Sequence, residues 1–115
     1  KIAKSQTISL ETRNTWCDGG QSNPPIVGLW DCDCQVLQSG DKYCCVRLYV
    51  DAPDGTVVQF ITSQGAYSEL SDWEGTNQSA KVEVNEVTFC AVVDGTHFLV
   101  HVNGYGCNEF EWSQC

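Results

Sequence analysis

The sequence predicts an all-β fold, an antiparallel β-sandwich or jelly roll that is rich in disulfides. Short runs of β-branched and aromatic residues are separated by Asp-Gly or Asn-Gly pairs, which are strong short-range signals for hairpins. Eight of the 115 residues are cysteine. No window has the 3.6-residue apolar period of an amphipathic helix. The length fits one domain, which we expect to span residues 1–115.

The expected strands lie mainly after residue 42. Cys44 to Val50 alternates between two faces, and Thr56 to Ile61 and Val82 to Val93 are dense in Val, Phe and Ile. The alternation is clearest in 97–102, where three residues are expected to face the core and three to face solvent: Phe98, Val100 and Val102 inward, and His97, Leu99 and His101 outward.

Three turns are expected to join hairpins, at Asp54-Gly55, Asp94-Gly95 and Asn103-Gly104. Before residue 43 the pattern is weaker. It favours strands at Thr7 to Leu10 and Ile26 to Trp30, with a loop at Asp18 to Pro25 between them.

The charge excludes two classes of partner. Fifteen Asp and Glu oppose six Lys and Arg, so the formal net charge is −9. Nucleic acid and anionic bilayers would repel such a chain, and no apolar run approaches the ~20 residues of a membrane-spanning helix. With its cysteines and its Lys1 start without any Met, the chain is expected to be a mature secreted, extracellular protein.

The cysteines are expected to form four disulfides, with about 105 pairings open. They are Cys17, Cys32, Cys34, Cys44, Cys45, Cys90, Cys107 and Cys115. Adjacent strand residues point to opposite faces, so Cys44 and Cys45 should not pair together. One should reach the interior and the other a covering loop or terminus. No spacing matches a zinc or redox site, so neither a metal nor another cofactor is expected.

Several tryptophans and histidines have structural explanations. Trp16, Trp30 and Trp112 lie within a few residues of a cysteine, which favours packing against disulfides. His97 and His101 would be roughly 13 Å apart on one strand face. That separation is too large for one tetrahedral metal site, so solvated histidines are expected.

The acidic and hydroxyl residues form no recognisable catalytic motif. Asp31 and Asp33 share a strand face, and with Asp18 or Asp41 they offer oxygen ligands for Ca²⁺, although a solvated acidic edge is the favoured interpretation. Because no nucleophile elbow, zinc-protease motif or P-loop occurs, we expect a non-catalytic protein.

Part of the chain resembles the galectins. The order of strands and turns from Phe89 to Trp112 resembles the galectin segment F-x-V-x-V-N-G, which corresponds to 97–104 here. Upstream, Tyr43 to Val50 and Val57 to Phe60 look like the strand pair that leads into the galectin sugar site. The resemblance covers roughly Tyr43 to Gly104 and implies a β-sandwich that binds carbohydrate.

The galectin sugar motif is largely absent. That family holds a galactoside with an H-x-N-x-R strand motif and a tryptophan within W-G-x-E-x-R. Aligned on Phe60, the three strand positions are Gln59, Ile61 and Ser63, and the tryptophan corresponds to Trp73.

A reduced sugar site is nevertheless expected at four residues. An aromatic ring covers the C–H face of a sugar, while amides and carboxylates bond its hydroxyls. Trp73 would supply the ring, and Gln59, Glu74 and Asn77 the polar groups. Asn77-Gln78-Ser79 is also an N-glycosylation sequon, which would place this segment in a surface loop.

Two functions therefore compete. The first is a secreted, lectin-like binding protein with Trp73 at a shallow carbohydrate site. The second is a secreted effector, toxin or signalling protein that binds a basic protein receptor through its acidic surface. Association with a basic receptor should weaken as salt rises, whereas sugar binding should not.

Overall fold

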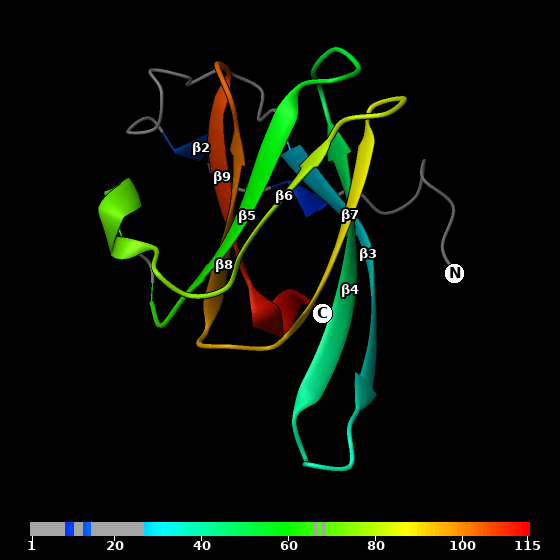
Figure 1. Cartoon of the computed structure of the whole chain (residues 1–115), viewed down its shortest axis with the longest axis vertical. Helices are drawn as coiled ribbons and strands as arrows, with labels where there is room; N and C mark the ends of the chain where they lie inside the picture. The colour runs from blue at the N-terminus through cyan, green and yellow to red at the C-terminus, as the bar shows by residue number, and fades with distance from the viewer. Residues whose placement is uncertain (1–8, 11–12, 15–26, 66, 68) are drawn as a thin grey trace.

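The computed structural model describes residues 9–10, 13–14, 27–65, 67 and 69–115. They form two packed antiparallel sheets without an α-helix, so the predicted disulfide-rich all-β fold is confirmed (Figure 1). The four-stranded sheet contains, in order, β1 (Ser9–Leu10), β3 (Val27–Val36), β4 (Lys42–Val50) and β7 (Glu86–Val92). The five-stranded sheet contains β2 (Arg13–Asn14), β9 (Gly106–Glu111), β8 (His97–Val102), β5 (Val57–Ser63) and β6 (Asn77–Lys81).

The main core lies between the two sheets. Alternate residues of β4, from Cys44 to Val50, face it as the sequence predicts. At its centre the ring of Phe98 lies 4.7 Å from that of Trp112 and 5.0 Å from that of Phe60. Each fully buried side chain of this size contributes about 1.5–3 kcal/mol, so these rings are a principal source of stability.

The outer face of the five-stranded sheet is also covered, which the sequence did not indicate. Leu99 is fully buried and His101 is 6% exposed, so their expected exposure is wrong. Leu99 packs with Ile61, Cys107 and Trp73 in a second apolar cluster on this face. His101 Nδ1 lies 3.0 Å from Gln59 Oε1, and His97 is half-buried.

The predicted turns are present, but two of them do not join hairpins. Gly55, Gly95 and Gly104 all have positive φ, at 91°, 72° and 82°. Only Asn103-Gly104 joins neighbouring strands, β8 and β9, whereas the other two turns carry the chain from one sheet to the other. The expected strand from Val82 to Val93 is interrupted by a turn at 83–86, and β7 begins at the last residue of that turn, Glu86.

Two disulfides join directly opposed residues of neighbouring strands in the four-stranded sheet. Cys34 of β3 bonds to Cys44 of β4, and Cys45 of β4 bonds to Cys90 of β7. Cys44 and Cys45 therefore have different partners, as predicted, and Cys44 is the buried member of the pair. The partner of Cys45 lies on an adjacent strand rather than on a covering loop or terminus, which corrects that detail.

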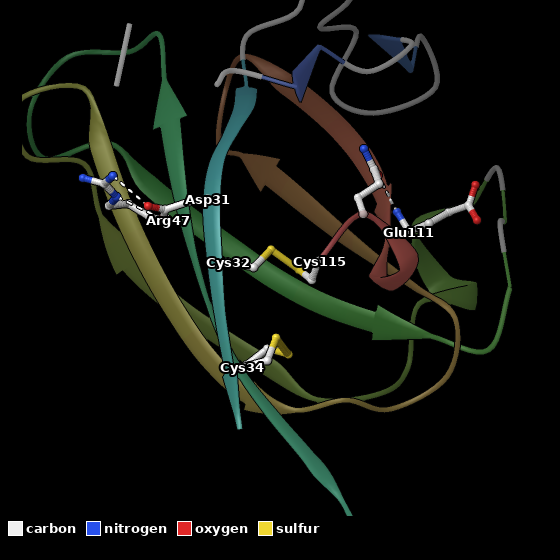
Figure 2. The surroundings of a disulfide bond; sticks show 8 residues. Asp31, Cys32, Cys34, Arg47, Glu111 and Cys115 are labelled. Carbon is white, nitrogen blue, oxygen red and sulfur yellow. Dashed lines mark hydrogen bonds and ion pairs between the residues drawn. A yellow bond between two sulfur atoms is a disulfide. The ribbon is translucent and has the colours of Figure 1, made fainter. Parts of the chain in front are cut away.

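A third disulfide fixes the C-terminal segment. Cys32 of β3 bonds to Cys115, which follows the short 3-10 helix η3 (Trp112–Gln114) (Figure 2). Cys107 is also disulfide-bonded. Cys17 lies outside the described residues.

Two of the three tryptophans that were expected to pack against disulfides are described. Trp30 and Trp112 are buried, and Trp16 is not among the described residues. Asp31 forms an ion pair with Arg47, 3.0 Å from its Nη2 (Figure 2). The hydrogen bond to Asp31 raises the pKa of Arg47 above its ordinary value. Both carboxylate oxygens of Asp31 accept hydrogen bonds from Arg47.

The expected N-terminal elements are only partly described. Of the strand expected at Thr7 to Leu10, the described part is β1, which pairs with β3. The strand expected at Ile26 to Trp30 is the start of β3, which continues to Val36. Ile26 and the expected loop at 18–25, with Asp18, lie outside the described residues. Within the described part of the chain, no helix has the length and apolarity to cross a membrane.

Candidate binding pocket

A pocket of about 280 Å³ opens where β5 ends. Its walls come from the end of β5, the β5–β6 loop and the β7–β8 connection. They are formed by Ser63, Gln64, Tyr67, Asp72, Glu74, Gly75 and Asp94. Ala66 and Ser68 of the same loop are not among the described residues.

Two glycines allow the walls to approach β5 closely. Gly75 donates its N–H to the Thr62 carbonyl oxygen at 3.0 Å, and a Cβ at this position would collide with the Thr62 side chain. Gly95 has positive φ, and a Cβ there would collide with the Ser63 carbonyl group. Larger residues at either position would push the loops away from β5 and open the pocket.

Tyr67 lines one side of the pocket, and Trp73 packs against it. Trp73 is 4% exposed, and its indole N–H donates to the Tyr67 carbonyl oxygen at 3.1 Å. The two rings meet edge to face, with centroids 6.4 Å apart. Tyr67 is 42% exposed and lines the pocket, so its ring is the one that a ligand can contact.

The expected role of Trp73 as an exposed sugar platform is therefore not what the structure shows. The 3-10 turn η2 (Leu70–Asp72) precedes it, and the Trp73 N–H donates to the Leu70 carbonyl oxygen at 3.1 Å. The ring is packed in the apolar cluster with Ile61 and Leu99. Trp73 thus supports the pocket from behind.

The other three predicted site residues are not brought together. Glu74 is exposed and lines the pocket. Asn77 is exposed at the start of β6, opposite Ile61, and does not line it. The segment is an edge strand rather than the expected loop. Gln59 lies near the start of β5, away from the pocket end, and is half-buried and hydrogen-bonded to His101.

Four other residues that line the pocket were not predicted from the sequence: Tyr67, Gln64, Asp72 and Asp94. A lone tyrosine in the polar segment 63–69 is the signal that could have pointed to the loop. Asp94 was assigned only to a turn, and nothing local shows that this turn lies beside the end of β5.

The pocket offers acceptors and an aromatic face. Asp72, Glu74 and Asp94 contribute carboxylates, and no Lys or Arg is among the described residues that line it. Gln64 Nε2 and Thr62 Oγ1 lie 3.5 Å and 3.4 Å from the Asp94 carboxylate oxygens, within donor reach. Such a set can bond hydroxyl groups or a cationic group.

The galectin resemblance remains a prediction that rests on the sequence alone. Comparison with protein-family models, with curated proteins and with solved structures finds no match to this chain.

Proposed function

We propose that this chain is a secreted, non-catalytic binding protein that recognises carbohydrate in the pocket at the end of β5. One observation carries the proposal: an exposed aromatic ring, Tyr67, shares a small pocket with an amide and three carboxylates. A sugar presents an apolar C–H face, which an aromatic ring can cover, and a rim of hydroxyls, which the amide and the carboxylates can bond.

The disulfides support the extracellular part of the proposal. Three of them join described residues, and no described cysteine is free. Such bonds form and persist in oxidising compartments and are rare in the reducing cytosol.

A glycan array probed with the oxidised protein tests the sugar-binding part. We expect defined glycans to bind, and Tyr67→Ala to weaken that binding about fivefold or more, because truncation of a central aromatic contact that contributes to affinity costs at least about 1 kcal/mol. Tyr67→Phe should retain most of it, since the ring face is kept. Tyr105→Ala is the matched control, because Tyr105 is 40% exposed and does not line the pocket.

Two results would contradict this proposal. A blank array would remove the sugar-binding function. Glycan binding that survives Tyr67→Ala unchanged would exclude the pocket as the sugar site.

The second candidate is binding to a basic protein receptor. It is favoured by the net charge of −9 and by the three carboxylates of the pocket, beside which the described lining residues include no Lys or Arg. Salt separates the two candidates, because association with a basic partner slows as ionic strength rises whereas sugar binding changes little.

A further inference from the structure

The turn between β6 and β7 has an unfavourable residue at its tip. Glu83 and Glu86 each donate an N–H to the other's carbonyl oxygen at 3.1 Å, which closes a two-residue turn. Its central residues both have positive φ, 51° for Val84 and 59° for Asn85. Asn tolerates this conformation, but a β-branched residue in it is a genuine outlier. Turns of this kind normally carry Asn-Gly.

The surrounding structure holds the turn firmly in place. The Val84 N–H donates to Asp54 Oδ1 at 2.8 Å. Asn85 bonds Val50 twice, since its carbonyl oxygen accepts the Val50 N–H at 2.9 Å and its amide donates to the Val50 carbonyl oxygen at 3.1 Å. Val84 adds little packing, because it is 73% exposed. The fold therefore explains the turn and Asn85, but not the valine.

Other exposed apolar side chains lie at the same end of the sandwich. The β4–β5, β6–β7 and β8–β9 connections all lie at this end, at the top of Figure 1. The Asn103 N–H donates to the Val57 carbonyl oxygen at 3.0 Å, which places the β8–β9 turn beside the start of β5. Val57 and Tyr105 are 37% and 40% exposed.

Three carboxylates lie on the segments that this turn bonds or joins. Asp54 bonds the Val84 N–H, Glu83 precedes Val84, and Asp51 follows Val50, to which the turn is bonded. All three are exposed. A basic, partly apolar partner would complement this surface, whereas a second copy of the chain would bring like charges together.

We propose that Val84 is the apolar anchor of a protein–protein interface whose partner has an apolar pocket bordered by Lys or Arg. Strained residues that the surroundings hold in place are characteristic of functional sites. The inference elaborates the second candidate function and does not depend on sugar binding at the β5 pocket.

Selection of peptides tests the interface. A phage-displayed library of random peptides is selected on the oxidised wild-type protein and counter-selected on Val84→Asn. We expect peptides that combine apolar residues with Lys or Arg, that bind Val84→Asn about tenfold or more weakly, and that weaken as salt rises. Val84→Ile and Tyr67→Ala should bind them like wild type. Val36→Asn is the matched control, since Val36 is 74% exposed in the β3–β4 hairpin.

The stability of Val84→Asn distinguishes an interface role from a structural one. Asn adopts the left-handed backbone conformation more easily than Val does. The substitution should therefore lower the equilibrium constant for unfolding, by up to about 5- to 30-fold. A destabilised Val84→Asn would give the valine a structural role and overturn the proposal. The proposal would also be overturned if no selected peptide bound Val84→Asn more weakly than wild type, or if the selected peptides lacked basic residues. Binding of phosphatidylcholine vesicles that is lost in Val84→Asn would reassign the surface to lipid.

Discussion

The buried hydroxyl of Thr62 connects three segments at the base of the pocket. The hydroxyl oxygen accepts the Thr76 N–H at 2.7 Å and lies 3.4 Å from Asp94 Oδ2. The backbone carbonyl oxygen of Thr62 accepts the Gly75 N–H. Thr62 is fully buried, so water cannot replace these bonds.

Thr62→Val should therefore destabilise the protein. The change keeps the shape of the side chain but leaves the Thr76 N–H without its acceptor, and we expect a loss of about 1–3 kcal/mol in the free energy of unfolding. Urea denaturation measures it. Thr88→Val, at an exposed position of β7, is the control. Equal stability of the two variants would show that this hydroxyl is not structurally important.

Individual residues were predictable where their sequence neighbours determine their environment. The burial of alternate residues in β4 follows from the two-residue period of a strand. Trp73 and Leu99 were not predictable in this way, because both are buried in a tertiary cluster on the outer face of the sheet. Polar neighbours in the chain suggested an exposed Trp73, and only the tertiary contact decides otherwise.

Among the connecting elements, the disulfides should differ in their contribution to stability. Cys32–Cys115 closes a separation of 83 residues, and Cys34–Cys44 one of 10. Loop closure stabilises the protein more when the loop is longer. The intact Cys45–Cys90 bond shortens the first loop in the unfolded chain, so the double Cys→Ser variant should lose at most about 4.5 kcal/mol for the first bond and about 2.7 kcal/mol for the second.

Chemical denaturation of the two double variants checks this order. Mass spectrometry under non-reducing conditions confirms that the other disulfides are unchanged. If loss of Cys34–Cys44 proves the more costly, native-state packing rather than loop closure governs these bonds.

Strands and turns were predictable, but their partners were not. Asp54-Gly55 and Asp94-Gly95 carry the local chemistry of a tight turn, and both glycines have the positive φ that it requires. That chemistry does not encode whether the next strand continues the same sheet or crosses to the other. The β6 strand was missed because it is polar, and Gln78 fixes it by donating to the Cys90 carbonyl oxygen at 2.8 Å.

For the whole molecule, the excess of negative charge should make stability depend on salt. Charges of one sign repel each other in the compact state, and salt screens them with a Debye length of about 8 Å at 0.15 M. We expect the melting temperature to rise between very dilute buffer and physiological ionic strength. An uncharged osmolyte at equal osmolality is the control. A fall in melting temperature would show that attractive pairs such as Arg47–Asp31 outweigh the net repulsion.

At this scale the composition was most informative. The cysteine count and the strand pattern predicted the disulfide-rich β class, because both are properties of the chain as a whole. The pocket depends on loops that meet only after the two sheets pack, so its residues were largely missed.

The bond between Cys32 and Cys115 also determines how the protein bears a mechanical load. A pull between the start of β3 and the C-terminal residue is transmitted through the Cys32–Cys115 sulfur bridge, which bypasses the chain between them. The intervening strands are shielded from tension while this bridge is intact. Reduction of the bond would allow the chain between Cys32 and Cys115 to extend, by roughly 3.3–3.6 Å per residue. The oxidised protein should therefore behave as a short, nearly inextensible link.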